Sequence, residues 1–139
     1  MSVTATVPQE SVWKRWRFTS LAALRKALEE YTALAMAQYT RGQTDGSDPD
    51  PETMDTEYRL MAQNREIDRR MLLLGRVAPL YCRILDGYFL SGLCCQAKGW
   101  EVTASRVGMP HFARRHRDVF EEVVSECVRE LFHVTETRS

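Results

Sequence analysis

The sequence lacks the features that would place the protein in an oxidising compartment or in a membrane. Its 139 residues include four cysteines, but no Cys-x-x-Cys pair occurs, and the adjacent Cys94 and Cys95 are poorly spaced as ligands of one tetrahedral zinc ion. The first ten residues lack the basic segment and apolar block of a secretion signal. No apolar run approaches the roughly 20 residues that span a bilayer. We therefore expect a cytoplasmic protein with reduced and mostly buried cysteines.

An excess of charge of one sign is also missing, because 19 Lys and Arg residues balance 19 Asp and Glu residues. Only the distribution of charge along the chain can therefore indicate a nucleic-acid partner. The three histidines have no partners at metal-ligand spacing. No Ser-His-Asp or Cys-His-Asp arrangement and no glycine-rich phosphate loop is visible. We therefore expect no enzyme, no metal ion and no cofactor.

Apolar residues recur at helical spacing, whereas sustained alternation and Asn-Gly hairpin signals are absent. The sequence therefore predicts an all-α fold, a small helical domain with a C-terminal helix-turn-helix. The predicted helices run from a cap at Thr19 or Ser20 to about Tyr39, from a cap at Asp55 or Thr56 to Gly75, and from Pro79 to about Leu90.

An acidic stretch with glycine and proline divides the chain. Residues 45–57 contain six acidic residues and no cation. This composition predicts a mobile, solvated loop over residues 44–56. The loop would separate an N-terminal arm and helix, residues 1–43, from a helical domain at residues 57–139.

The stretch WEVTASRVGMPHFARRHR, residues 100–117, combines turn signals with cations. Ala104 and Gly108 suit a close helix crossing followed by a turn with positive φ. Pro110 suits the start of the next helix. We expect that helix to be continuous, and Val107 and Phe112 to pack into the same core. Its expected apolar positions are Phe112, His116, Val119, Val123, Cys127 and Leu131.

Between residues 98 and 117 five cations face one acidic residue, Glu101, and the remainder of the last helix is acidic. Cations near a helix N-terminus oppose the preference of the helix dipole, so a role other than helix stability is indicated. The pattern favours a helix-turn-helix that reads double-stranded DNA in the major groove. The alternative is an ordinary solvated bend between two helices. The predicted DNA contacts are Lys98, Thr103, Ser105, Arg106, His111, Arg114, Arg115 and Arg117.

The segment LYCRILDGYFLSG (80–92), followed by ASRVGM (104–109) and a cationic helix, resembles the region-4-type helix-turn-helix of sigma factors. It is most similar to phage late-gene regulators built on that plan, among them the Q-type antiterminators and the RinA/ArpU-like activators. The resemblance covers residues 77–132. It implies binding to a specific DNA site and contact with bacterial RNA polymerase, with or without a sigma factor, and no catalysis.

Two further stretches carry charge. Residues 12–18, VWKRWRF, interleave aromatic residues and cations. They are interpreted either as a contact with phosphates or an acidic polymerase surface, or as an apolar arm docked on the core with its cations outward. The contact residues would be Trp13, Lys14, Arg15, Trp16 and Arg17. Residues 64–70, NREIDRR, are predicted to form a solvated helix face with i,i+4 ion pairs.

Two other functions stay open from the sequence. One is a viral DNA packaging protein resembling a small terminase subunit, which would use the same motif and assemble into a ring. The other is a helical interaction module without DNA affinity. A homodimer is also open.

Overall fold

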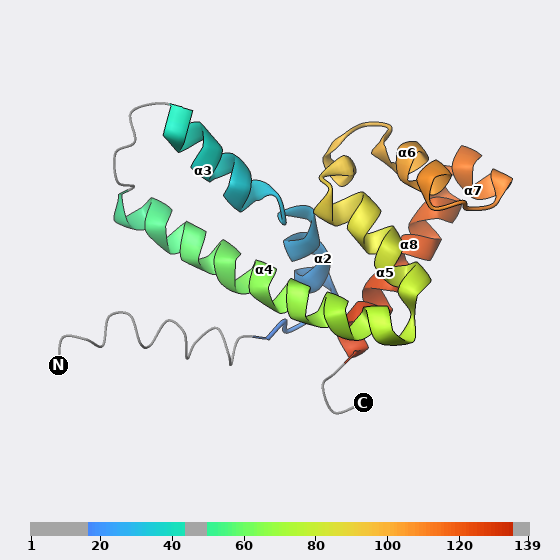
Figure 1. Cartoon of the computed structure of the whole chain (residues 1–139), viewed down its shortest axis with the longest axis horizontal. Coiled ribbons are helices and arrows are strands. Elements are labelled where there is room, and N and C mark those ends of the chain that lie inside the picture. The colour runs from blue at the N-terminus through green and yellow to red at the C-terminus, as the bar shows by residue number, and fades with distance from the viewer. Residues whose placement is uncertain (1–16, 44–49, 135–139) are drawn as a thin grey trace.

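The structure, a computed structural model, describes residues 17–43 and 50–134, and every regular element in these ranges is a helix (Figure 1). This confirms the all-α prediction for the described part of the chain. The elements are α2 (Leu21–Glu29), α3 (Ala33–Gln43), α4 (Pro51–Val77), α5 (Pro79–Leu85), the π-helical segment η2 (Asp86–Leu90), the 3-10 segment η3 (Leu93–Cys95), α6 (Gly99–Arg106), α7 (His111–Arg115) and α8 (Arg117–His133).

Helix α8 is the centre of the core, because it packs against α2, α4, α5, α6 and α7. Its apolar stripe (Phe120, Val124, Cys127 and Leu131) repeats at three- and four-residue spacing and is completely buried. The surrounding helices contribute fully buried side chains of their own, among them Leu24, Leu28, Ile67, Leu74, Leu85 and Phe89. One continuous core therefore joins helices from both ends of the sequence.

The first predicted helix is not continuous, since the chain bends at residues 30–32 between α2 and α3. The Tyr31 hydroxyl donates to Asp68 Oδ1 at 2.7 Å, and the Tyr31 carbonyl accepts from Asn64 Nδ2 at 2.9 Å. Both bonds tie the bend to α4. Helix α3 consequently lies along the first half of α4, and the pair extends away from α8 (Figure 1).

Helix α4 begins earlier and ends later than the sequence predicts. It starts at Pro51, so the predicted loop at 44–56 is wrong for residues 51–56; residues 44–49 lie outside the described part of the chain. The Asp50 carboxylate caps the helix by accepting from the Thr53 amide at 2.8 Å. Helix α4 passes through Gly75 and ends at Val77, because Ala78 precedes Pro79 and is extended, with φ −147°.

Residues 64–70 are not the solvated face that the sequence predicts. Glu66 and Arg70 are buried, and Arg70 Nε donates to Glu66 Oε2 at 2.7 Å. Arg70 Nη1 also donates to the carbonyls of Leu131 and Phe132 at 3.2 and 2.6 Å. Carbonyls in the last turn of a helix lack intrahelical donors. Arg70 therefore joins α4 to the C-terminal end of α8.

All four cysteines are free thiols, but the expectation that most are buried is wrong. Only Cys127 is buried, Cys95 is exposed, and the other two are intermediate. No helix within residues 17–43 and 50–134 combines the length and apolar character needed to cross a membrane.

Candidate nucleic-acid interface

Helix α6 ends in the tight turn that the sequence predicts. Gly108 has φ 73°, its amide donates to the Ser105 carbonyl at 3.2 Å, and the Met109 amide donates to the Ala104 carbonyl at 2.9 Å. These two bonds and the left-handed glycine form a Schellman motif, in which a contact between the residue after the glycine and the last turn is usual. Met109 and Ala104 are both buried here. The turn therefore reverses the chain while its apolar residues stay in the core.

The start of α6 depends on a close backbone approach. A Cβ on Gly99 would overlap the carbonyl group of Leu93, so no larger residue fits without a shift of the backbone. The next residue, Trp100, packs against Phe120 with ring centroids 6.0 Å apart, and Phe120 in turn meets Tyr88 at 5.0 Å. These aromatic contacts fix α6 on η2 and α8.

The helix after the turn is not continuous, contrary to the prediction. It divides into α7 and α8 at His116, which is extended with φ −120° and ψ 108°. Ala113 and Phe120 are both buried and lie seven residues, or two turns, apart. In one uninterrupted helix Arg117 would lie between them on the same buried face. The break lets Arg117 remain exposed while both apolar residues reach the core.

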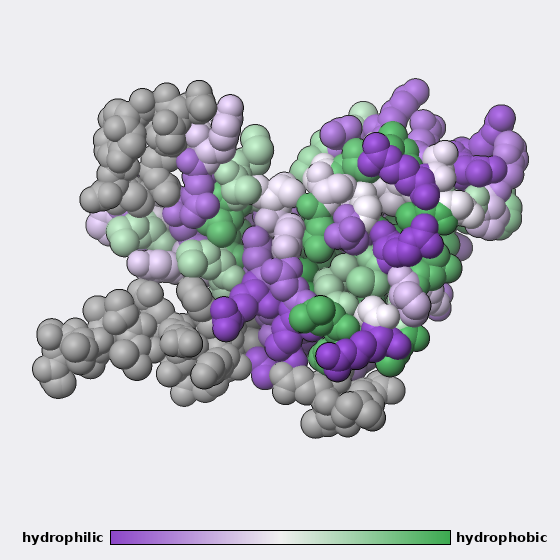
Figure 2. All heavy atoms as spheres, in the orientation of Figure 1, coloured by the Kyte–Doolittle hydropathy of each residue, from purple (hydrophilic) through white to green (hydrophobic). Residues whose placement is uncertain are grey.

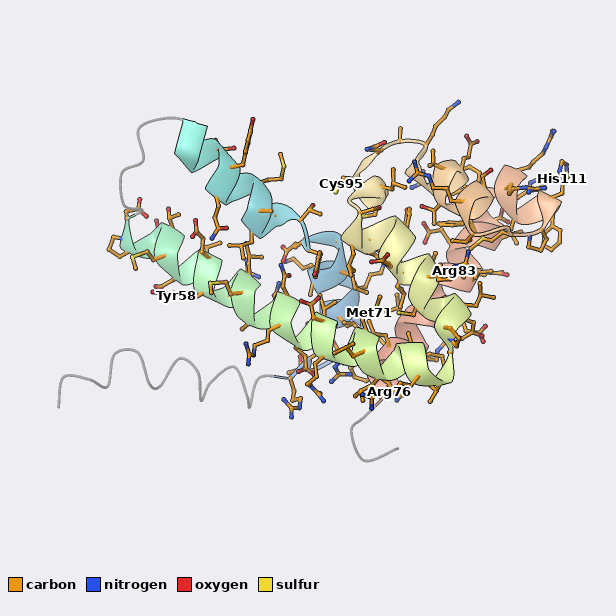
Figure 3. The ribbon with its side chains drawn as sticks, viewed as in Figure 1. Tyr58, Met71, Arg76, Arg83, Cys95 and His111 are labelled. Atoms are coloured by element: carbon orange, nitrogen blue, oxygen red, sulfur yellow. The ribbon has the colours of Figure 1, made fainter. Side chains whose placement is uncertain are left out.

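Exposed cations gather around α6 and α7, and we call this set the basic corner. Within the described residues none of its members is in an ion pair. Figure 2 shows hydrophilic side chains over α6 and α7 at this end of the molecule, and His111 lies at its outer edge in Figure 3. The members are Lys98, Arg106, Arg114, Arg115 and Arg117.

A polar hollow of about 500 Å³ separates α6 from α7. Its lining residues are Glu101 and Ser105 from α6 and Arg114 and Arg115 from α7. Two arginines and a serine thus border a shared space. This arrangement suits an acceptor-rich ligand such as a phosphate or a guanine edge. The single carboxylate, Glu101, can accept from a donor such as the cytosine amino group.

The cations of the basic corner fall into two groups, one at the two ends of α6 and one at the junction of α7 and α8. Lys98 directly precedes α6 and Arg106 ends it, so they lie about 12 Å apart along the helix axis. Arg114 and Arg115 end α7, and Arg117 begins α8. The structure therefore brings Ser105 together with the α7 arginines, while Lys98 lies at the opposite end of α6.

Thr103 is the one predicted DNA contact that the structure contradicts. Its side chain is fully buried, and its hydroxyl donates to the Gly87 carbonyl at 3.3 Å. The Ser91 hydroxyl donates to the same carbonyl at 2.6 Å. Thr103 therefore holds α6 against the π-helical segment and has no surface with which to meet a base.

Two of the expected apolar positions, His116 and Phe112, are exposed, and the larger departure is Phe112 because its ring is apolar. Helical spacing predicts it in the core, but its side chain is 56% exposed on α7 among the cations. Ala113 occupies the buried position instead. Helical spacing predicts a buried Phe112 only if one helix continues through His116, and the break at His116 removes that condition. The sequence indicates Glu101 only as the one acidic residue among the five cations, and the structure shows in addition that it lines the hollow.

Of the predicted contacts near the N-terminus, Trp13, Lys14, Arg15 and Trp16 lie outside the described residues. Arg17 is described, and its Nη1 lies 3.8 Å from Glu66 Oε1. Phe18 beside it is buried. At this point the chain docks on the core, while a role of Arg17 toward phosphates or polymerase stays a prediction.

Within the described ranges no cluster of three or more His, Cys, Asp or Glu residues could hold a metal ion. A comparison of the chain with protein-family models, curated proteins and solved structures finds no match.

Proposed function

We propose that the basic corner binds double-stranded DNA, with α6 and α7 acting as the two helices of a helix-turn-helix. The observation that carries this proposal is the concentration, on one protruding corner of a chain with net charge +0, of five exposed cations that form no ion pair with any described residue. Several arginines elsewhere are instead neutralised by carboxylates, as Arg25 is by Glu121 at 2.9 Å. Phosphate neutralisation by such free cations supplies most of the affinity of DNA-binding proteins.

The dimensions of the corner suit a reader that enters the groove end-on. Helix α7 has five residues and is about 8 Å long, whereas the major groove is about 12 Å wide. Only α7 and the residues just after it would therefore reach the bases. We assign base contacts to His111, Arg114 and Arg115. Lys98, Arg106 and Arg117, at the edges of the corner, would hold phosphates.

Phe112 gives this interface an apolar contact. An exposed phenyl ring on a groove-entering helix can contact the methyl group of thymine, the one apolar feature of the major groove. Because the ring is 56% exposed, the fold itself gains little from it. The proposal accounts for a large apolar side chain at a position where solubility would favour a polar one.

The wider role we propose is that of a phage or prophage transcription regulator. In this role the protein binds its DNA site and then engages RNA polymerase, most closely in the manner of a Q-type antiterminator of late genes. The support for this part is the resemblance of residues 77–132 to sigma-region-4-like regulators. The buried packing of α6 on η2 and α8 is compatible with such a module.

The test compares two double variants that remove the same charge. Arg114→Ala with Arg115→Ala alters the hollow, whereas Arg76→Ala with Arg129→Ala alters exposed arginines on α4 and α8. Binding of the full chain to duplex DNA is measured by fluorescence anisotropy, after selection of a preferred site from random sequence. We expect the first variant to lose about 5- to 150-fold per arginine on the preferred site, corresponding to about 1–3 kcal/mol each, and the control to lose little.

Salt dependence separates phosphate contacts from base contacts. Lys98→Ala or Arg106→Ala should weaken binding to all duplexes alike and lower the slope of log K against log salt by about one unit each. Equal loss in both double variants, or no binding by the wild type in low salt, would overturn the proposal. The polymerase step is tested by read-through of a terminator downstream of the selected site.

A further inference from the structure

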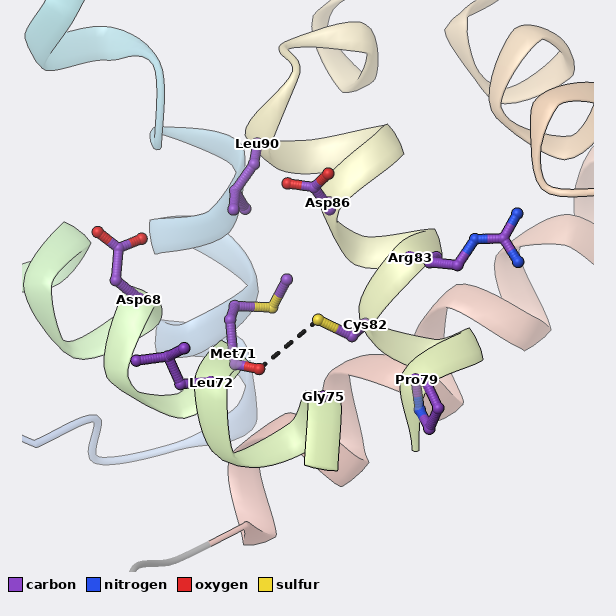
Figure 4. A pocket seen from close by; sticks show the side chains of 9 residues that line it. All are labelled: Asp68, Met71, Leu72, Gly75, Pro79, Cys82, Arg83, Asp86 and Leu90. Atoms are coloured by element: carbon purple, nitrogen blue, oxygen red, sulfur yellow. Dashed lines mark hydrogen bonds between the residues drawn. The ribbon is translucent and has the colours of Figure 1, made fainter. Parts of the chain in front are cut away.

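A second hollow of the surface, a groove, shares no residue with the basic corner. It lies between the C-terminal half of α4 and the pair α5–η2, with a volume of about 530 Å³ (Figure 4). Met71 and Gly75 of α4 and Cys82 of α5 line it, and the Cys82 thiol donates to the Met71 carbonyl at 3.6 Å. No side chain of the described residues fills this space.

The rim of the groove exposes more apolar surface than the fold requires. Leu72 is 70% exposed, and it lines the groove. Val77 and Leu80, at the corner between α4 and α5, do not line the groove but are 69% and 51% exposed. Leu72 is thus a large aliphatic side chain that stands in water on the groove itself, where an apolar contact with a partner would cover it.

The charges that line the groove are of both signs and are not neutralised by the described residues. Asp68 and Asp86 line the groove, as does Arg83, which points away from Asp86 in Figure 4. None of the three is in an ion pair with another described residue. Asp68 accepts only the hydroxyl hydrogen bond of Tyr31. A partner surface with charges of one sign would leave either the two aspartates or the arginine without a partner.

We infer that this groove, which we call the α4–α5 groove, is the interface with a second copy of the same chain. In a two-fold dimer the same patch meets itself, so each copy must carry both halves of every complementary pair. The groove meets this requirement: Arg83 of one copy can face the aspartates of the other, and Leu72 of each can enter the partner's hollow. The inference does not depend on DNA binding.

The first experiment measures the mass of the full chain by sedimentation equilibrium from about 1 to 100 µM. We expect a dimer, and we expect Leu72→Glu to be monomeric across this range because the substitution places a charge in the apolar contact. The control is Met54→Glu on the same helix, at an exposed position far from the groove; it should remain dimeric. Far-UV circular dichroism confirms that both variants are folded.

The second experiment uses the two-fold symmetry. Arg83→Asp and Asp86→Arg should each dissociate at least tenfold more readily than the wild type, because each homodimer then places like charges opposite each other. Mixed one to one, the two variants should form a heterodimer, in which the two exchanged charges face each other and the second pair keeps its native residues. In a control mixture of Arg83→Asp with Arg129→Asp, the Arg129→Asp variant should remain a homodimer, and the heterodimer, which keeps one pair of like charges, should form less readily than in the first mixture. Recovery is not expected from any interface that leaves the groove empty.

A monomeric wild type at 100 µM overturns the inference, and so does a dimer that persists in Leu72→Glu. A closed ring of more than two copies also overturns it. Failure here leaves the DNA proposal intact, since a monomer with the basic corner still binds non-specific duplex DNA. If the protein is a dimer but does not bind DNA, the DNA proposal is overturned and the dimer inference stands.

Discussion

Replacing Arg70 by methionine should be among the most destabilising changes available on α4. The side chain is 6% exposed, and its Nε hydrogen bond to Glu66 and its two bonds to α8 carbonyls are all lost in the variant. Breaking a buried ion pair costs about 3–5 kcal/mol because the remaining charge is uncompensated. Glu66 keeps two hydrogen bonds from Arg69, at 3.0 and 2.7 Å, so we expect the lower limit, about 3 kcal/mol.

Urea unfolding followed by circular dichroism measures this loss as a lower midpoint at an unchanged slope. The matched control is Arg129→Met, at an exposed position on α8, for which a change within about 0.5 kcal/mol is expected. Adding Glu66→Gln to Arg70→Met should restore part of the stability, because the buried charge is then removed. A loss below about 1 kcal/mol, or a double variant less stable than Arg70→Met, would refute the reasoning.

The ion pairs of Glu66 with Arg69 and Arg70 predict that the protein loses stability at low pH. Burial alone would raise the pKa of the Glu66 carboxyl, but hydrogen bonds from Arg69 and Arg70 and their charges outweigh it and hold the pKa below its ordinary value. A carboxyl with a depressed pKa in the folded state stabilises the fold above its unfolded pKa of about 4.3. That contribution is lost as the pH falls through the folded-state pKa. Midpoints measured from pH 7 to pH 3 should fall less steeply in Glu66→Gln.

Two further predictions concern glycines and thiols. Gly99→Ala should cost about 2 kcal/mol or more by thermal unfolding, because the new Cβ meets the Leu93 carbonyl; Gly108→Ala, where nothing lies near the Cβ, should cost only about 1 kcal/mol for its positive φ. Equal losses would contradict the close approach. Burial raises the pKa of the Cys127 thiol to about 12, so iodoacetamide at pH 8 should label exposed Cys95 in the native protein and Cys127 only after unfolding; rapid native labelling of Cys127 would count against its burial.

Local signals predicted the turn at the basic corner but not the break beside it. Glycine adopts a positive φ without steric cost, and the ring of proline fixes its φ at about −65°. Gly108 is in the predicted turn, and Pro110 directly precedes α7. His116 has no such intrinsic preference. The chain is extended there because Ala113, Phe120 and Arg117 make incompatible demands on one helix face, and that conflict is visible only once the core is assembled. Phe112 was misplaced for the same reason.

The start of α4 was predictable in principle. Asp50 followed by Pro51 is a helix N-terminal signal, with a capping carboxylate and a proline at the first helical position. The acidic composition of the surrounding residues, in contrast, predicts a loop. The bend at Tyr31, by contrast, depends on hydrogen bonds to residues more than 30 positions away. No local pattern reports such contacts.

The extended conformation of His116 also separates the mostly exposed helix α7 from helix α8 with its buried stripe, so that a change in one need not shift the other. The exposed side chains of α7, at positions 111, 112, 114 and 115, can change in size and charge without altering the register of α8, whose buried stripe begins at Phe120. Exposed substitutions of this kind usually change stability by less than about 0.5 kcal/mol. On the proposed DNA-binding surface, a few residues of α7 can therefore be exchanged while the fold is inherited unchanged.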